Sequence, residues 1–173
     1  MKIILFMAMS LNGMIASKSG NEDFLSDTNW KSFGELVKKH GCFIIGRKTY
    51  ETVQKWPDYN FNDIKARLKI VVSNDKDLKL APPFLAANSP KDAIEKAIAM
   101  NFESAILTGG STINSAFISA NLIDEVIINI EPAIIGSGIS IFAESDFEKR
   151  LSLDEAVRIT DDIMQIKYKV NKN

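Results

Sequence analysis

Three short segments of this sequence carry residue types that bind anions. Gly46–Thr49 and Ser73-Asn74 follow directly after runs of apolar residues, and Gly109–Thr112 follows one after a single threonine, Thr108. Glycine lets the backbone turn tightly and expose N–H groups, while hydroxyl groups and cations supply further donors. This chemistry favours a phosphate-bearing ligand. A Gly-Gly pair between a strand and a helix also fits a plain tight connection, so both interpretations stay open.

The surrounding elements position these segments. Ala105–Leu107 is a short apolar run that predicts a strand buried on both faces. Ser111 and Thr112 are expected to cap the helix that follows. The spacing i, i+3, i+4 and i+7 predicts that one face of this helix is formed by Ile113, Ala116, Phe117 and Ala120.

The same reading gives an element order for the rest of the chain. A helix is expected from Ser26 or Asp27, a second after Gly46 that ends at Trp56-Pro57, and a third from Ser89-Pro90. Further strands are expected at Lys2–Met9, Cys42–Ile45, Leu68–Val72, Phe84–Ala87 and Asp124–Glu131, and an antiparallel pair with one solvated face at Leu151–Ile159 and Ile163–Val170. This order predicts one α/β domain over residues 1–173, with a mostly parallel sheet, helices on both faces and an antiparallel C-terminal hairpin. The three anion-binding segments would then meet at one edge of the sheet.

Composition narrows the classes of protein. The 173 residues carry a formal net charge of −1, with 46% apolar and 25% charged residues, which predicts a cytoplasmic protein without a nucleic-acid or membrane partner. Cys42 is the single cysteine and lies in an apolar run, which favours a buried, inert thiol. His40 is the single histidine, so no metal site is expected.

The motifs together resemble the dihydrofolate reductase superfamily, and most closely the C-terminal reductase domain of riboflavin biosynthesis. Gly46–Glu51 resembles the Gly-Arg-x-Thr segment of dihydrofolate reductases. The other segments that carry the resemblance are Ser10–Ala16, Arg67 with Ile70–Ser73, Ile106–Gly110, Thr108–Asn114, Leu122–Glu125 and Pro132–Gly138. The resemblance implies a three-layer, dihydrofolate reductase-like sandwich and an NADPH cofactor.

The resemblance also implies roles for the cofactor-binding residues. Arg47 and Lys48, with Ser73, would face the 2′-phosphate, and a forked guanidinium suits a phosphate dianion. Ala8 and Ile15 would lie beside the nicotinamide, and Ser17–Asp23 would form a mobile loop over it. The full implied set is Ile15, Gly46, Arg47, Lys48, Thr49, Ser73, Asn74, Gly109, Gly110, Ser111 and Thr112.

The implied substrate residues are Ala8, Asp27, Trp30 and Arg67. Asp27 is the expected catalytic residue, which orients the substrate and aids its protonation, with water as the other proton source. Each has a plainer interpretation: Asp27 as a helix N-cap, Trp30 as a core residue, and Arg67 as a solvated strand start. Two family motifs are absent, since no Pro-Trp precedes the first helix and Glu51–Trp56 does not match the Asp-Pro-x-Leu-Thr-x-Arg of riboflavin reductases.

The resulting expectation is an NADPH-dependent reductase of a small heterocycle. The substrate would be a riboflavin-pathway pyrimidine, as for 5-amino-6-(5-phosphoribosylamino)uracil reductases, or a pterin. The alternatives are a dihydrofolate reductase proper, or a non-catalytic nucleotide-binding module that kept only the cofactor site. By analogy with the riboflavin-type relatives, a homodimer could form through the C-terminal strand and the Pro132–Phe142 loop.

Overall fold

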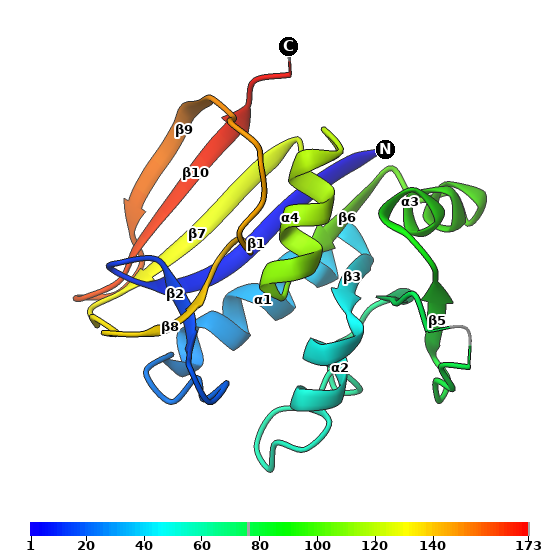
Figure 1. The fold of residues 1–173 in the computed structure, drawn as a ribbon, viewed down its shortest axis with the longest axis horizontal. Helices are drawn as coiled ribbons and strands as arrows, with labels where there is room; N and C mark the ends of the chain where they lie inside the picture. The colour runs from blue at the N-terminus through cyan, green and yellow to red at the C-terminus, as the bar shows by residue number, and fades with distance from the viewer. Residues whose placement is uncertain (76, 173) are drawn as a thin grey trace.

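An eight-stranded sheet runs through the computed structural model, which describes residues 1–75 and 77–172 (Figure 1). The spatial order is β5-β4-β3-β6-β1-β7-β10-β9, and all strands from β5 to β7 are parallel, while β10 and β9 are antiparallel. The mostly parallel sheet with an antiparallel C-terminal hairpin is thus confirmed. The strands are β1 (Lys2–Ser10), β3 (Cys42–Gly46), β4 (Leu68–Val72), β5 (Phe84–Ala87), β6 (Ser104–Leu107), β7 (Glu125–Glu131), β9 (Leu151–Arg158) and β10 (Met164–Val170).

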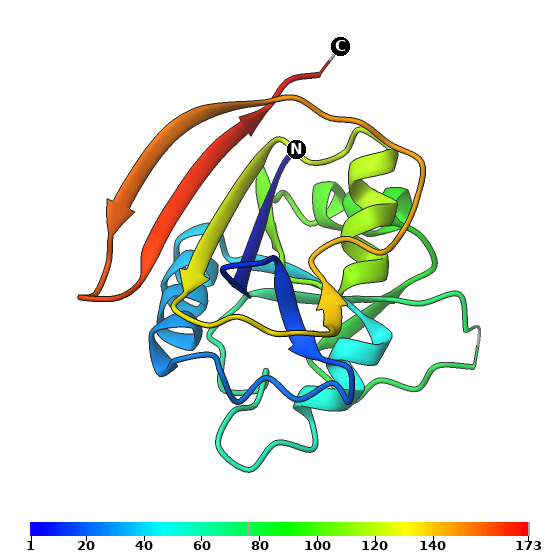
Figure 2. The ribbon, with the colours of Figure 1, turned by 60° about the vertical axis from the view of Figure 1, so that its left-hand side comes forward.

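Two short strands form a separate antiparallel pair beside the main sheet. These are β2 (Met14–Ser17) and β8 (Gly138–Ser140), which lie side by side in Figure 2. The pair joins a segment near the N-terminus to one more than a hundred residues later, with Ala16 opposite Ile139. It thereby fixes where the chain after β2 turns towards the first helix.

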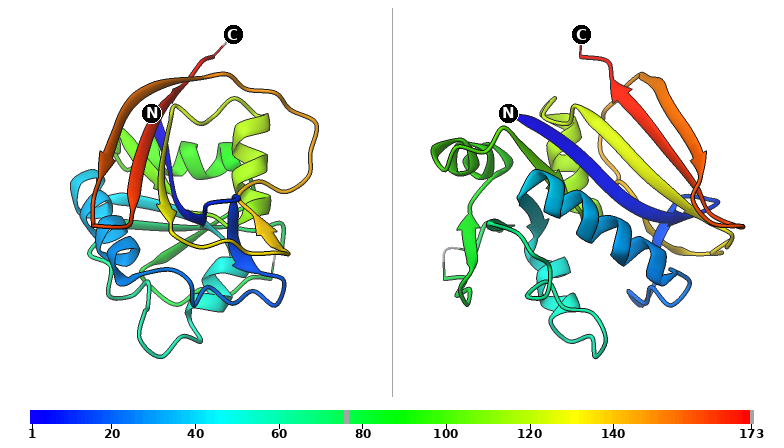
Figure 3. Two further views of the ribbon diagram at one scale, coloured as in Figure 1. Left: turned by 90° about the vertical axis from the view of Figure 1, so that its left-hand side faces the viewer. Right: turned by 180° about the vertical axis from the view of Figure 1, so that it is seen from behind.

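Helices cover both faces of the sheet, as the two opposite views in Figures 1 and 3 show. On one face α1 (Asp27–His40) and α2 (Arg47–Val53) pack on alternate strand residues such as Ile4 and Phe6. On the other face α3 (Pro90–Ala99) and α4 (Ser111–Ser119) pack on the intervening residues. Because both faces are buried, the central strands read as continuous apolar runs.

Two helix ends follow the expected capping rules. Ser89 precedes α3, and its hydroxyl oxygen accepts a hydrogen bond from the backbone N–H of Asp92 at 3.1 Å, while Pro90 is the first helical residue. Gly41 ends α1 with a φ of 76°, a left-handed conformation that glycine adopts without strain. Both ends therefore follow from local sequence.

The helix α4 differs from its expected form. Gly110 stands at its N-cap position without a side-chain cap, and Ser111 is the first helical residue. Its buried residues include Ile113, Phe117 and Asn114, whereas Ala116 and Ala120 are exposed. The physical cause is the segment after β8, which covers the polar side of the helix: Asn114 Nδ2 donates to the carbonyl of Ile141 at 2.8 Å and Ser115 Oγ donates to that of Ala143 at 2.9 Å.

The helix α2 is shorter than expected. It ends at Val53 rather than at Trp56-Pro57. The chain continues as tighter turns, in which the N–H of Lys55 donates to the Thr52 carbonyl and that of Trp56 to the Val53 carbonyl. Trp56 is thereby carried out of the helix and into the wall of the cavity described below.

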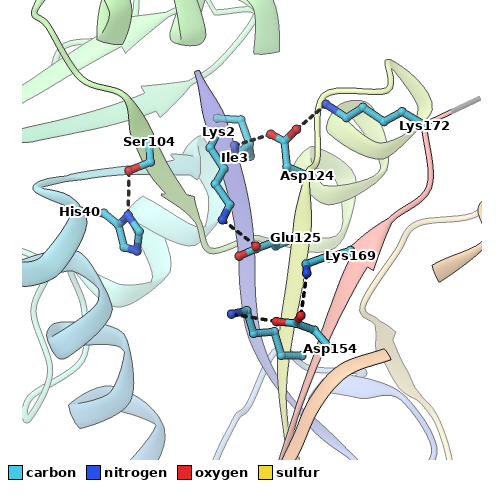
Figure 4. Close-up of polar contacts among 10 residues, drawn as sticks. Lys2, Ile3, His40, Ser104, Asp124, Glu125, Asp154, Lys169 and Lys172 are labelled. Atoms are coloured by element: carbon cyan, nitrogen blue, oxygen red, sulfur yellow. Dashed lines mark hydrogen bonds and ion pairs between the residues drawn. The ribbon is translucent and has the colours of Figure 1, made fainter. Parts of the chain in front are cut away.

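The hairpin of β9 and β10 departs from the expected single solvated face. All eight residues of β9 are exposed, because β9 is the outermost strand and the hairpin curves away from the helical layers (Figure 2). Asp154 holds the two strands together through Lys167 at 3.1 Å and Lys169 at 2.8 Å (Figure 4). These pairs are partly exposed, so packing of β10 on β7 contributes more to holding the hairpin.

A set of polar contacts closes the amino end of β1, shown in Figure 4. The Asp124 carboxylate accepts from the backbone N–H of Ile3 at 2.7 Å and from Lys172 Nζ at 2.6 Å. Lys2 pairs with Glu125 at 2.6 Å. These contacts pin the start of β1 to β7 and to the C-terminal segment, and so fix the strand that carries Ala8 at its other end.

The remaining side chains named in the sequence have structural surroundings. Cys42 is fully buried, and burial raises the pKa of its thiol to about 12. His40 Nδ1 lies 2.7 Å from the Ser104 hydroxyl (Figure 4). Over residues 1–75 and 77–172, no three acidic, histidine or cysteine side chains gather in a way that could hold a metal. None of the described helices combines the length and apolar character needed to cross a bilayer.

Candidate functional site

A cavity of about 780 Å³ opens at the carboxyl ends of β1, β3, β4 and β6. This is the edge where open α/β sheets bind ligands, and the volume lies in the range of small-molecule sites. All three anion-binding segments predicted from the sequence reach it. The predicted site residues in its wall are Ala8, Ile15, Trp30, Gly46, Arg47, Lys48, Thr49, Ser73, Asn74, Gly110, Ser111 and Thr112.

The strand ends of β3 and β6 are joined at Gly109. Its carbonyl accepts a hydrogen bond from the N–H of Gly46 at 2.8 Å, and its φ of 85° favours glycine. The Gly109–Gly110 peptide bond is cis. Gly109 itself lies behind the wall, and Gly110 lines the cavity. A Cβ on Gly110 would lie only 3.1 Å from Thr49 Oγ1, a contact so close that the Thr49 side chain would have to shift by a few tenths of an ångström.

One part of the wall, here the anion half, consists of Gly46–Thr49, Ser73–Asp75 and Gly110–Thr112. It combines the N-terminus of α4 with hydroxyl groups and two cations. Arg47 is partly exposed and pairs with Glu51 at 2.8 Å, one helical turn later. A guanidinium has five N–H donors, so this single contact leaves others for a ligand.

Another part of the wall, here the aromatic half, is built by β1, β2, residues 20–26, α1 and residues 52–61. Its centre is Trp30, whose ring centroid lies 5.2 Å from that of Tyr59 and 5.5 Å from that of Phe61. Trp56 contacts Tyr59 edge-on at 6.4 Å. Both tryptophans of the chain therefore lie in this half, which presents aromatic faces and edges to a planar ligand.

A buried lysine holds the aromatic half in place. Lys69 is the second residue of β4, and its ammonium group donates to the carbonyls of Phe61 at 2.7 Å and Asn62 at 3.1 Å. The side chain is 3% exposed, and burial lowers its pKa. The loop that carries Tyr59 and Phe61 is thus tied to the sheet. The sequence offered a signal, a lysine inside an apolar strand, which the sequence analysis did not use.

A buried polar chain supports the floor of the same half. Glu131, at the carboxyl end of β7, accepts hydrogen bonds from Ser26 Oγ at 2.9 Å and from Asn29 Nδ2. Asn29 Oδ1 in turn accepts from Asn129 Nδ2 at 2.8 Å, and Gln165 continues the chain. The carboxylate stands at the N-terminus of α1, where the helix dipole favours negative charge. Asn29 faces the cavity with its amide fixed by these partners.

Glu22 is an acidic side chain of the cavity that sequence reasoning missed. It lies in the wall of the aromatic half, in the loop between β2 and α1. Burial raises its pKa from 4.5 to about 7. Across the described part of the chain, its carboxyl has neither a hydrogen-bond partner nor an ion-pair partner. The loop is folded by contacts of Ser17 with Asn21, which bring Glu22 inward.

Two predicted substrate residues lie elsewhere. Asp27 is exposed at the first position of α1, outside the wall, and its carboxylate accepts a hydrogen bond from the Tyr59 hydroxyl at the rim. Arg67 is exposed at the amino end of β4 and stacks on Phe102 at 4.7 Å. Arg67 does not line the cavity, because the amino end of a parallel strand lies at the sheet edge opposite to it, so its contact with substrate stays a prediction.

Comparison with known proteins gives relatives over most of the chain. A YwjB protein of Bacillus subtilis (strain 168), described as uncharacterized, is 29% identical over 157 residues, which cover 88% of each chain. A 2,5-diamino-6-ribosylamino-4(3H)-pyrimidinone 5′-phosphate reductase of Methanothermobacter thermautotrophicus is 27% identical over 170 residues, covering 78% of this chain and 79% of the relative.

Solved structures share the fold. A pyrimidine reductase-like protein from Corynebacterium diphtheriae superposes with a TM-score of 0.80 at 14% identity, covering 99% of this chain and 92% of the other. Dihydrofolate reductase from Enterococcus faecalis, complexed with NADP(H), gives 0.72 at 19% identity, covering 99% and 97%. The family model described as the RibD C-terminal domain matches residues 1–165. With its cavity at the predicted strand ends and its match over nearly the whole length, this chain belongs to the RibD C-terminal domain family.

Proposed function

We propose that this protein is an NADPH-dependent reductase that transfers a hydride to a C=N or C=O bond of a small planar heterocycle. The observation that carries the proposal is the continuity of the two halves of the cavity. An anion-binding wall and an aromatic wall face one space, so a charged dinucleotide and a flat substrate can meet there. The match to a reductase family supports the reaction class.

The anion half fits NADPH by its chemistry. Gly110, Ser111 and Thr112 begin α4, where free N–H groups suit a pyrophosphate. Thr49 Oγ1 lies on the other side of this anion site, and a Cβ on Gly110 would lie 3.1 Å from it. Arg47 and Lys48 suit the 2′-phosphate, with Ser73 and Asn74 beside them in the wall. When bound, the cofactor would supply the hydride.

The residues of this chain would then orient the reactants and exclude water. Ala8 and Ile15 are buried apolar residues of β1 and β2, next to which the nicotinamide would lie. Trp30, Tyr59 and Phe61 would hold the substrate ring. This apolar enclosure strengthens the polar contacts made inside it.

The substrate class remains that of nitrogen heterocycles of the pyrimidine or pterin type. The relative from Methanothermobacter is named for a pyrimidinone substrate, and the structural relative from Enterococcus is a dihydrofolate reductase. Dihydrofolate is the less favoured substrate. The expected acid, Asp27, lies at the rim of the cavity, and the residue of α1 that lines the cavity at its floor is the neutral Asn29. The alternative is a non-catalytic nucleotide-binding module. Such a module would bind NADPH in the titration below but would not oxidise it in a substrate screen.

The experiment is a titration of the protein with NADPH and with NADH, followed by nicotinamide fluorescence. Arg47→Ala is expected to weaken NADPH binding by about tenfold or more and to leave NADH nearly unaffected, because a charge-assisted phosphate contact is lost. Arg150→Ala is the matched control, an exposed arginine outside the cavity that also has an acidic neighbour, Glu148. Equal affinity for both cofactors, or no binding of either, would contradict the proposal.

We also propose a homodimer that forms through β9. This strand is the last in the sheet, all its residues are exposed, and Leu151 and Leu153 are 42% and 62% exposed. An edge strand of this length with apolar side chains can pair with a second copy. Light scattering after size exclusion tests this: Leu153→Lys is expected to shift the mass from dimer to monomer, and a monomeric wild-type protein would contradict it.

A further inference from the structure

The charges in the cavity wall are divided between its two halves. Arg47, Lys48 and Asp75 belong to the anion half. In the aromatic half, Glu22 is the one charged residue among those that the structure describes. The cations are therefore gathered where the cofactor is proposed to bind, and the part left for the substrate has an acid and no described cation.

The remaining polar groups of the aromatic half suit a neutral ring. Asn29 and Ser26 have side chains fixed by Glu131, and both face the cavity. Around them Trp30, Tyr59 and Phe61 present aromatic surface. An aromatic ring with N–H and C=O groups at its edge can stack here and exchange hydrogen bonds with fixed amide and hydroxyl groups.

A phosphate group has no complement in this half. A phosphate dianion in a partly enclosed site needs cations or several free N–H donors, and a nearby acid adds repulsion. Glu22 has no partner among the described residues that would neutralise it, and burial brings its pKa to about 7. In its acid form it can donate to a ring nitrogen or carbonyl, and in its ionised form it can accept from a ring N–H or amino group.

We propose that the aromatic half binds a nitrogen heterocycle that carries no phosphate, and that Glu22 determines this preference. The inference rests on the proposed function for the division of the cavity, and it narrows the substrate to unphosphorylated forms such as nucleosides or free bases. Glu22 contacts the heterocycle itself, and the cofactor phosphates stay in the anion half.

The test uses a matched pair of probes and the two tryptophans as reporters. The probes are 2,5-diamino-6-ribosylamino-4(3H)-pyrimidinone and its 5′-phosphate, each titrated with and without NADPH. Trp30 and Trp56 both line the cavity, so their fluorescence reports occupancy of the aromatic half. The nucleoside is expected to bind at least about tenfold more tightly than the phosphate. Equal or tighter binding of the phosphate overturns the proposal, as does failure of both probes to change the fluorescence.

A charge-reversal variant tests the role of Glu22 directly. Glu22→Lys is expected to reduce or invert the preference between the two probes by about tenfold, because it replaces repulsion of the phosphate with attraction. Glu35→Lys is the matched control, with the same change of charge on an exposed position of α1 outside the wall, and it should leave the ratio unchanged. An unchanged ratio in Glu22→Lys would refute the role of Glu22.

The NADPH titration separates this inference from the proposed function. If NADPH fails to bind while the nucleoside is still preferred, the cofactor assignment is wrong and the substrate inference stands. If NADPH binds with the expected preference while the phosphate is favoured or neither probe binds, the substrate inference is wrong and the cofactor assignment stands.

Discussion

The ammonium group of Lys69 lies 2.7 Å from the carbonyl oxygen of Phe61 and so connects β4, the second strand from one edge of the sheet, to the loop that carries Tyr59 and Phe61 into the cavity wall. The same group reaches the Asn62 carbonyl at 3.1 Å. A charged group is costly to bury unless its donors find partners, and here two carbonyls accept from the ammonium group, which also lies 5.5 Å from the centroid of the Phe84 ring. One side chain of β4 therefore holds the loop in its position against the sheet.

Replacing Lys69 with methionine should loosen this loop. The change keeps much of the side-chain volume but removes hydrogen bonds that contribute about 0.5–1.5 kcal/mol each, so local opening should become about tenfold more frequent. Amide hydrogen exchange measured by mass spectrometry should rise in residues 57–64 and stay unchanged in β1. Lys65→Met, at an exposed position of the same segment, is the control. Equal protection of residues 57–64 in both variants would show that Lys69 does not anchor the loop.

The substitution Asn29→Asp tests why the floor of the cavity carries an amide. It would place a second carboxylate against the buried Glu131, where like charges in a weakly solvated site repel. We expect a loss of about 2–4 kcal/mol in the free energy of unfolding at pH 8, measured with urea. Asn62→Asp, on the exposed surface, should change stability little at this pH.

The strand ends of the site were predictable because their chemistry is local. Gly46, Arg47 and Gly110 stand within three residues of the end of an apolar run, and parallel topology brings such strand ends to one edge. Asn29 also left a local signal, since it shares a helical face with Phe33 and Val37, four and eight residues later.

Other residues depend on contacts that are distant in sequence. Glu22 lies between Asn21 and Asp23, a stretch that reads as a solvated loop, and only the folded cavity wall buries it. The face of α4 was misassigned because the segment carrying Ile141 and Ala143 covers its polar side. The spacing of apolar residues within a helix cannot predict that a distant segment will bury its polar side.

Gly110→Ala should impair cofactor binding without unfolding the protein. The added Cβ would lie 3.1 Å from Thr49 Oγ1, in the anion site proposed for the pyrophosphate. We expect NADPH affinity to fall by about tenfold or more, measured by nicotinamide fluorescence, because the new methyl group displaces the Thr49 hydroxyl where the phosphates are proposed to bind. In Gly136→Ala the new Cβ meets open space, so affinity should be unchanged. Equal affinities in the two variants would place the phosphates elsewhere.

The raised pKa of Glu22 predicts a dependence of stability on pH. Because burial raises the pKa from 4.5 to about 7, the folded state holds this proton more tightly than the unfolded state. Protonated Glu22 therefore contributes to the free energy of unfolding fully below about pH 4.5. This contribution, at most about 3 kcal/mol, is lost as the pH rises through about 7. Glu22→Gln removes the titration, so its free energy of unfolding should match wild type near pH 4 and exceed it at pH 8.

Urea unfolding between pH 4 and pH 8 measures this difference, with Glu35→Gln as the control on the exposed face of α1. The control should follow the wild-type curve, because Glu35 is exposed on α1 and lies outside the cavity wall. A wild-type curve with the same slope as Glu22→Gln would mean that the Glu22 carboxyl is solvated in solution. A solvated Glu22 carboxyl would repel a phosphate only weakly. Glu22 would then not explain the proposed preference of the site for an unphosphorylated ring.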